Sequence, residues 1–197
     1  MTHNVLLTGV GGEGVLLTSV IVARAANIEG YEVRGTQFHG LAQRGGSIPT
    51  QIRFGKKVYS PMIPRGQADL ILGLEPIEAA RACFYASKKR TGFIVDTYPV
   101  KPVYLNLLGH IYPSNEEIRK MITPFAKKSI FVDASNICRE KFGNPIYGNV
   151  MAIGVALSSG MLPLSKKSVL ESIKGTVPRR ALKENGAAFE LGLKFKG

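Results

Sequence analysis

Cysteine is scarce in this chain of 197 residues, since Cys83 and Cys138 are the only two. They lie far apart, and neither belongs to a CxxC pair. An iron–sulfur cluster or a Cys₄ zinc site needs about four thiolates, so we expect neither on this chain alone. Nothing in the sequence points to an oxidising compartment, and we therefore expect two buried thiols rather than a disulfide.

Long apolar runs and targeting signals are also lacking. The most apolar late stretch, residues 150–164, is interrupted by Ser158, Ser159 and several glycines and prolines. A bilayer span needs about 20 apolar residues, so this stretch does not qualify. The N-terminal residues lack the basic and apolar regions of a signal peptide. We expect a cytoplasmic protein with no membrane partner.

Several signatures of catalysis are missing as well. The sequence contains no GxxxxGK[ST] phosphate loop, no HExxH zinc motif and no GxSxG elbow. It also lacks the GDG signature of thiamine diphosphate binding. No side chain stands out as a nucleophile or proton donor, so the sequence identifies no catalytic residue.

Acidic residues are few, because 14 Asp and Glu stand against 26 Lys and Arg and leave a formal net charge of +12. Such an excess is typical of a protein with an anionic partner, which includes nucleic acid, phosphate-bearing ligands and acidic proteins. The short clusters at 88–90, 127–128, 166–167 and 179–180 lack the interleaved aromatics that single-stranded nucleic acid favours. We interpret them as solvated faces and expect no nucleic-acid partner.

What the sequence does contain is an alternation of short apolar strands and helices. Hydrophobic residues make up 45% of the chain, and its length suits one domain over residues 1–197. Strands are predicted at 4–8, 31–36, 69–74, 91–97 and 129–133, helices at 15–28, 75–87 and from 114, and only helices after 134. The first strand, helix and second strand predict a βαβ unit in a parallel sheet.

Residues 37–68 interrupt this alternation. The positions from Ile48 to Phe54 alternate between apolar and polar, which predicts a half-buried strand. Gly55-Lys56-Lys57 is typical of a hairpin turn, with 58–60 as the returning strand. We expect a single three-layer, Rossmann-like α/β domain with a mostly parallel sheet, an inserted β-hairpin and a helical C-terminal third.

The segment from Gly9 to Gly14 matches GxGxxG between a strand and a helix. Glycines allow a tight turn and let backbone N–H groups approach a phosphate, and the helix N-terminus adds partial positive charge. The candidate binding residues are Gly9, Gly11, Gly12 and Gly14. Glu32 begins the next strand, so the acid that would bind an NAD ribose at its far end is missing, and Glu13 opposes a phosphate. The alternative is a turn that serves only helix–strand packing.

A second glycine-rich segment runs from His39 to Ser47. The guanidinium of Arg44 offers a planar fork of donors beside glycines that expose their amides, which suits an oxyanion. The candidate binding residues are Gln43, Arg44, Gly45, Gly46 and Ser47. The alternative is a surface loop whose glycines serve the hairpin, and the role of His39 stays open.

Both glycine-rich segments closely resemble those of the small (beta) subunits of indolepyruvate:ferredoxin oxidoreductases. Those subunits are similar to the gamma subunits, or gamma domains, of the wider 2-oxoacid:ferredoxin oxidoreductases. The resemblance continues in order at Tyr59-Ser60-Pro61, Ile63-Pro64, Ala68-Asp69, Leu74-Glu75-Pro76, Asn149-Val150-Met151 and Asn185 to Phe189. It covers nearly the whole chain, and Glu13 departs from it where Gln is usual.

The resemblance implies a gamma-type catalytic domain in a hetero-oligomeric enzyme that is inactive without its partner. The complete enzyme would oxidatively decarboxylate an arylpyruvate such as indolepyruvate, with coenzyme A and ferredoxin, to aryl-acetyl-CoA and carbon dioxide. Thiamine diphosphate and the [4Fe–4S] clusters would belong to the alpha subunit. The glycine loop and residues 43–47 would close the active site or receive an anionic ligand such as coenzyme A or the substrate carboxylate.

Two other functions stay open. A gamma subunit of a pyruvate, 2-oxoisovalerate or 2-oxoglutarate ferredoxin oxidoreductase shares this domain, and a free-standing nucleotide-binding protein would use the first glycine loop alone.

Residues 33–68 contain no acid but six cations, namely Arg34, Arg44, Arg53, Lys56, Lys57 and Arg65. We interpret this block as one local basic surface for an anionic ligand or a partner subunit.

Overall fold

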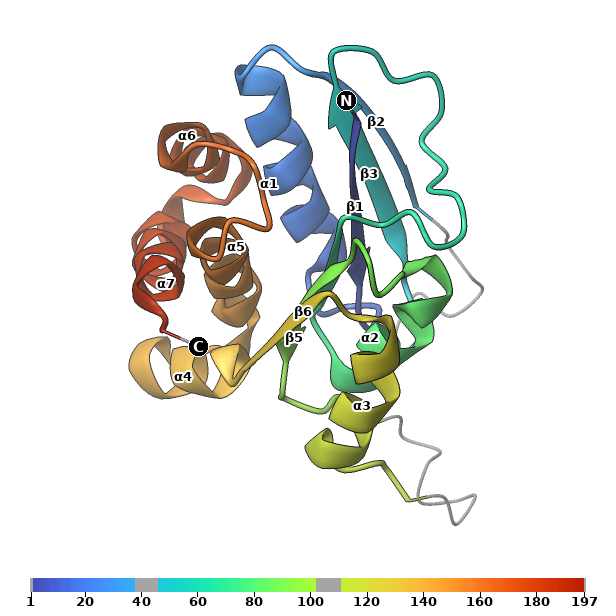
Figure 1. Cartoon of the computed structure of the whole chain (residues 1–197). Coiled ribbons are helices and arrows are strands. Elements are labelled where there is room, and N and C mark those ends of the chain that lie inside the picture. The colour runs from blue at the N-terminus through green and yellow to red at the C-terminus, as the bar shows by residue number, and fades with distance from the viewer. Residues whose placement is uncertain (1, 38–45, 102–110, 197) are drawn as a thin grey trace.

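A six-stranded sheet lies between two layers of helices in the computed structural model, which describes residues 2–37, 46–101 and 111–196 (Figure 1). The strands are β1 (Thr2–Thr8), β2 (Glu32–Gln37), β3 (Thr50–Gly55), β4 (Leu70–Gly73), β5 (Gly92–Asp96) and β6 (Lys128–Val132). Their order in the sheet is β2-β3-β1-β4-β5-β6. The predicted strands at the start of the chain and at 69–74, 91–97 and 129–133 are confirmed within one or two residues.

Helices cover both faces of this sheet, which confirms the three-layer α/β class. One face carries α1 (Val15–Ile28), α4 (Ala134–Phe142), α5 (Gly148–Ser158), α6 (Lys166–Thr176) and α7 (Leu182–Lys194), and the other carries α2 (Pro76–Arg81) and α3 (Asn115–Ile122). Each face has its own apolar core, the first under α1 and α5 and the second under α2 and α3. Beyond residue 134 the described residues form helices and no strand, as the sequence predicts.

The sheet is mostly parallel, but one strand runs against the others. The central strand β1 pairs in parallel with β4 and antiparallel with β3, and β3 is also antiparallel to β2. Strands β1 and β2 therefore point the same way, as a βαβ unit requires, yet they are not neighbours because β3 lies between them. The predicted βαβ unit is thus present, with the antiparallel strand β3 inserted between its two parallel strands.

The inserted hairpin exists, but its strands differ from the predicted ones. The prediction paired residues 48–54 with 58–60, whereas β3 forms its hairpin with β2, and 58–60 are not a strand. The physical reason lies in the pairing of Gly55, which is opposite both Thr2 and Glu32. With both edges of β3 occupied, no edge is left for a returning strand, and the strand is buried rather than half-buried.

The C-terminal helices pack closely where α5 crosses α7. Glycines meet at this crossing, since a Cβ atom on Gly154 would lie 2.5 Å from the carbonyl oxygen of Phe189. A Cβ atom on Gly192 would overlap the carbonyl oxygen of Met151. Phe189 is fully buried, so these helices form part of the first apolar core. Within the described segments, none of the helices has the length and apolar character that crossing a bilayer would require.

Candidate functional site

The loop from Gly9 to Gly14 connects the end of β1 to the start of α1, where the sequence predicts it. Gly12 and Gly14 adopt positive φ angles of 97° and 80°, a conformation that other residues rarely adopt. A Cβ atom on Gly14 would also lie only 3.0 Å from the Nδ2 atom of Asn149. This turn therefore requires glycine both for its backbone conformation and for the approach of α5.

Backbone hydrogen bonds join this loop to the second glycine-rich segment. Gly11 N donates to the carbonyl of Gly46 at 2.8 Å, and Ile48 N donates to the carbonyl of Gly9 at 2.9 Å. The structure thus brings Gly46 and Ser47 beside the glycine loop, as the two motifs together suggest. Three further candidates, Gln43, Arg44 and Gly45, lie outside the described residues, as does His39.

Some amides of the glycine loop are left available for a ligand. Among the described residues, the N–H groups of Gly12 and Gly14 donate no hydrogen bond, and Gly12 is exposed. They precede the first turn of α1, whose free N–H groups carry partial positive charge and which contains no acid. The Glu13 side chain is exposed at the surface. Successive free amides at a helix N-terminus are suited to an anion such as phosphate or carboxylate.

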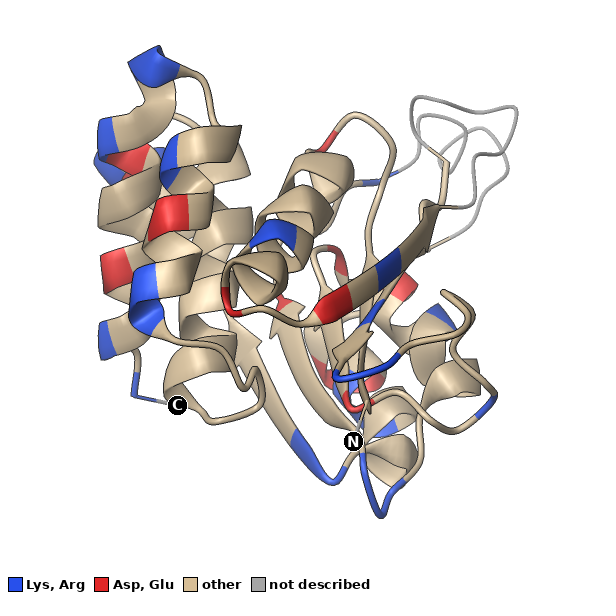
Figure 2. Cartoon of the chain, turned by 90° about the horizontal axis from the view of Figure 1, so that it is seen from above, with Lys and Arg blue, Asp and Glu red and all other residues tan. Residues whose placement is uncertain are grey.

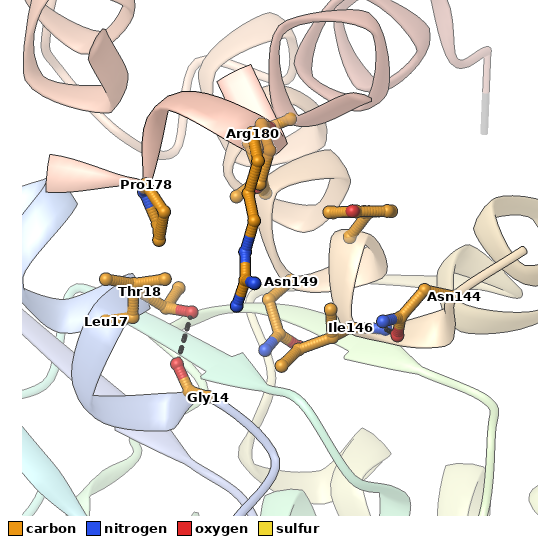
Figure 3. Close-up of a pocket in the computed structure, with 12 residues that line it drawn as sticks. Gly14, Leu17, Thr18, Asn144, Ile146, Asn149, Pro178 and Arg180 are labelled. Carbon is orange, nitrogen blue, oxygen red and sulfur yellow. Dashed lines mark hydrogen bonds between the residues drawn. The ribbon is translucent and has the colours of Figure 1, made fainter. Parts of the chain in front are cut away.

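A pocket of about 440 Å³ opens beside these amides, between the starts of α1 and α5 and the turn at Arg179–Ala181. Figure 3 shows Arg180 reaching from that turn toward Thr18 and Asn149. Among the described carboxylates none forms an ion pair with Arg180, so its guanidinium is free to bind an anion. Arg180 is exposed, as the sequence-based interpretation of 179–180 as a solvated face expects, and it also lines this pocket.

Asn149 connects the pocket to the glycine loop. Its side chain is 6% exposed, and its Nδ2 atom donates a hydrogen bond of 2.6 Å to the carbonyl of Glu13. Burial without this bond would leave a polar group unsatisfied, so Asn149 fixes the loop against the start of α5. The partners are 136 residues apart in sequence, which is why no local pattern could reveal the contact.

The cations of residues 33–68 do not gather around this site. Arg34 pairs with Glu32 at 2.7 Å, and half-buried Arg53 donates to Asn4 and to two backbone carbonyls. Lys56 and Lys57 follow Gly55 at the opposite end of the strands from the glycine loop, where β1 begins. Figure 2 looks onto that end and shows Lys and Arg spread over several elements. The described cations of residues 33–68 therefore do not line the pocket, and Arg44 lies outside the described residues.

A buried carboxylate also stands at the end of β5, close to the start of α4. Asp96 is 1% exposed and accepts hydrogen bonds from the Ser135 hydroxyl at 2.6 Å, from Ser135 N at 3.1 Å and from Tyr98 N at 3.2 Å. Burial raises the pKa of Asp96 to about 6, helped by the nearby charge of Asp133, while the hydrogen bonds oppose the rise. Burial likewise raises the pKa of the neighbouring Cys138 thiol to about 12.

Asp96 is expected to make the protein less stable as the pH rises. Its pKa is higher in the folded chain than in the unfolded one, so between pH 4 and 7 the unfolded carboxyl loses its proton first. This carboxyl then lowers the free energy of unfolding by about 3 kcal/mol over that range. In Asp96→Asn, which cannot titrate, that part of the pH dependence should vanish. Urea unfolding of both proteins at several pH values measures it.

The control for this experiment is the exposed Glu171, changed to Gln. Its stability difference from the parent protein should stay constant over the same pH range, because an exposed carboxylate interacts weakly with its surroundings. A difference between Asp96→Asn and the parent that is equally constant would contradict the assignment to Asp96.

Known proteins resemble this chain along nearly its whole length. The family model for pyruvate ferredoxin/flavodoxin oxidoreductase matches residues 4–195. Indolepyruvate oxidoreductase subunit IorB of Pyrococcus horikoshii is 39% identical over 193 residues, which cover 98% of this chain and 95% of that protein. The gamma subunit of a keto/oxoacid ferredoxin oxidoreductase from Geobacter sulfurreducens has the same fold, with a TM-score of 0.67, 22% identity, and coverage of 98% and 96%.

A larger enzyme contains this fold as one part. The 2-oxoglutarate:ferredoxin oxidoreductase of Magnetococcus marinus, solved with 2-oxoglutarate, coenzyme A and succinyl-CoA bound, aligns with a TM-score of 0.69 at 17% identity. The alignment covers 98% of this chain and 30% of that chain. The fold described above is thus found both as a separate subunit and within a longer polypeptide.

Proposed function

Because this chain belongs to the pyruvate ferredoxin/flavodoxin oxidoreductase family and is a subunit of a 2-oxoacid ferredoxin oxidoreductase, we propose that its complex acts on arylpyruvates. The complex oxidatively decarboxylates indolepyruvate or a similar 2-oxoacid. Coenzyme A receives the acyl group as a thioester, carbon dioxide leaves, and the electrons pass to ferredoxin. The observation that carries this substrate class is the 39% identity to an indolepyruvate oxidoreductase subunit over nearly the full chain.

We place thiamine diphosphate and the iron–sulfur clusters on an alpha partner subunit. The two cysteines do not fit a cluster, since Cys138 is buried in the core under α1 and α5 while Cys83 packs against the core on the other face of the sheet. Burial also raises the pKa of the Cys83 thiol to about 11, which disfavours the thiolate that binds metal. Within the described segments no three His, Cys, Asp or Glu side chains gather as a metal site would require.

The role of this chain in the complex is to bind an anionic group at the glycine loop. Gly14, the first turn of α1 and Arg180 border one pocket, and the free amide of Gly12 lies in the same loop as Gly14. Amides and a guanidinium supply hydrogen-bond donors to an anion. A coenzyme A phosphate or the carboxylate of the 2-oxoacid is the matching ligand. Gly9 and Gly11 shape the loop, and we assign Gln43, Arg44, Gly45, Gly46 and Ser47 to the same site. Residues 1–197 form one gamma-type catalytic domain in this proposal.

Reconstitution with an alpha subunit tests this function. The chain is purified alone and together with a partner that carries the thiamine and iron–sulfur motifs, and ferredoxin reduction is followed spectroscopically. We expect reduction that depends on both coenzyme A and indolepyruvate for the pair, and none for the chain alone. Pyruvate, 2-oxoisovalerate and 2-oxoglutarate are the comparison substrates. Faster turnover of any of these would overturn the arylpyruvate assignment, and activity of the isolated chain would overturn its role as a subunit.

A further inference from the structure

Two buried glutamates stand at the start of α2, which follows β4, at the same end of the sheet as the glycine loop. Glu75 is 1% exposed and Glu78 is 4% exposed. Glu75 caps α2, because its Oε2 atom accepts a hydrogen bond of 3.0 Å from Glu78 N. The end of β4 packs closely against α2, since a Cβ atom on Gly73 would overlap Ala79. Carboxylates are rarely buried without strong partners, so the partners of these two indicate what the start of α2 does.

Glu78 holds the segment that supports the glycine loop. Its Oε2 atom accepts a hydrogen bond from the Ser47 hydroxyl, and its Oε1 atom lies 3.3 Å from a guanidinium nitrogen of exposed Arg81. The residues on either side of Ser47 make the two backbone bonds to the glycine loop described above. Ser47 therefore lies between a buried carboxylate and the candidate ligand site, and Glu78 fixes its position.

Glu75 holds a different part of the chain at the same end of the sheet. Its Oε1 atom accepts hydrogen bonds from the Tyr112 hydroxyl and, at 3.3 Å, from Val100 N. The Tyr112 hydroxyl oxygen in turn accepts a bond of 3.3 Å from Ile77 N in α2. Burial raises the pKa of Glu75, and the hydrogen bonds from the Tyr112 hydroxyl, Glu78 N and Val100 N oppose the rise.

From this arrangement we propose that Glu75 and Glu78 are coupled positioning residues for the ligand site. The start of α2 holds the Ser47 hydroxyl with the Glu78 carboxylate, and it holds the Tyr112 hydroxyl and the Val100 amide with the Glu75 carboxylate. A disturbance at Tyr112 therefore reaches the glycine loop, although Tyr112 makes no hydrogen bond to it. The inference concerns the residues of this chain alone and rests on the proposed function only for its kinetic consequence.

Amide hydrogen exchange of the isolated chain tests the coupling. Tyr112→Phe removes one hydroxyl, and we expect the exchange of Gly11 and Ile48 amides to quicken roughly three- to tenfold, as the loss of about one hydrogen bond would produce. In the reverse direction, Ser47→Ala should quicken the exchange of Val100 N by a similar factor. Exchange that quickens only at Val100 and Ile77 in Tyr112→Phe would overturn the proposal.

Two further variants separate positioning from general loss of stability. Ser172→Ala removes a buried hydrogen bond of 2.7 Å from the Ser172 hydroxyl in α6 to the carbonyl of Ile21. This variant should leave the ratio of the exchange rates of the Gly11 and Val100 amides unchanged. Glu78→Gln keeps an acceptor for Ser47 and should behave like the parent protein, while Glu78→Ala should not. If Glu78→Ala fails to fold, the comparison of Tyr112→Phe with Ser47→Ala still decides the question.

The kinetic consequence is measured in the reconstituted complex. Tyr112→Phe and Ser47→Ala should each raise the KM of the ligand bound at the glycine loop, and the double variant should raise it by less than the product of the two factors. Independent, multiplicative effects would contradict coupling. A complex without arylpyruvate activity would overturn the proposed function, but the exchange measurements would still decide this inference.

Discussion

Replacing Gly192 with alanine is expected to lower the free energy of unfolding by about 3 kcal/mol, the upper end of the range for overpacked cores. The added methyl group would overlap the carbonyl oxygen of Met151 and would lie 2.9 Å from the Cα atom of Gly154. Both are backbone atoms, which cannot rotate away as a side chain does. Helices α5 and α7 must therefore separate and expose part of the core around Phe189. Urea unfolding followed by circular dichroism measures the loss.

The same helix supplies the control. Gly186 also lies in α7, but a Cβ atom there would meet nothing within 4 Å. Gly186→Ala should therefore raise stability by about 1 kcal/mol, since alanine favours the helix more than glycine does. Opposite signs at two glycines of one helix would confirm that the crossing, and not helix propensity, determines the requirement at Gly192. Equal effects of the two substitutions would contradict it.

Replacing Arg180 with alanine in the reconstituted complex is expected to raise the KM of the bound anion by roughly ten- to a hundredfold. A hydrogen bond to a charged group contributes about 1.5–3 kcal/mol, and the guanidinium offers two in parallel. Arg180→Lys should recover part of the affinity, because the ammonium keeps the charge without the planar fork. We expect a small effect on kcat, since the contact forms when the ligand binds.

Steady-state kinetics with each substrate varied in turn identifies the ligand. A raised KM for coenzyme A assigns Arg180 to its phosphates, and a raised KM for the 2-oxoacid assigns it to the carboxylate. Arg179→Ala is the matched control, because Arg179 shares the turn and is exposed but does not line the pocket. Equal losses for Arg179→Ala and Arg180→Ala would show a general effect of charge and would contradict a specific contact.

Local patterns in the sequence predict the elements of the fold well but not their pairing. The helix at 15–28 has the predicted bounds because its apolar residues and Gly30 are local signals. The position of β3 between β1 and β2 depends on which strand edges are free after the chain folds. The alternation from Ile48 to Phe54 indicates a strand, but it carries no information about which strands lie beside it. Local patterns alone therefore favour a hairpin that turns at Lys56.

The candidate site is predictable to the extent that its residues are close in sequence. The glycine loop has a spacing that reflects the chemistry of anion binding, and the structure shows that the segment around Gly46 and Ser47 lies beside it. Arg180 and Asn149 reach the pocket only through the packing of the C-terminal helices. Asn149 belongs to a segment that carries the family resemblance, but neither residue has a local pattern that places it at the site. Glu75 and Glu78 look like ordinary charged residues at a helix start, because burial depends on the tertiary structure.

The central position of β1 opposes the order in which the chain is synthesised. This strand is synthesised before both of its neighbours, β3 and β4, which are complete only at Gly55 and Gly73. Until then the apolar residues Val5, Leu6 and Leu7, which are fully buried in the folded protein, have no strand to pair with. A nascent chain in this interval exposes an apolar strand with two unpaired edges, which is the kind of segment through which incompletely folded chains aggregate.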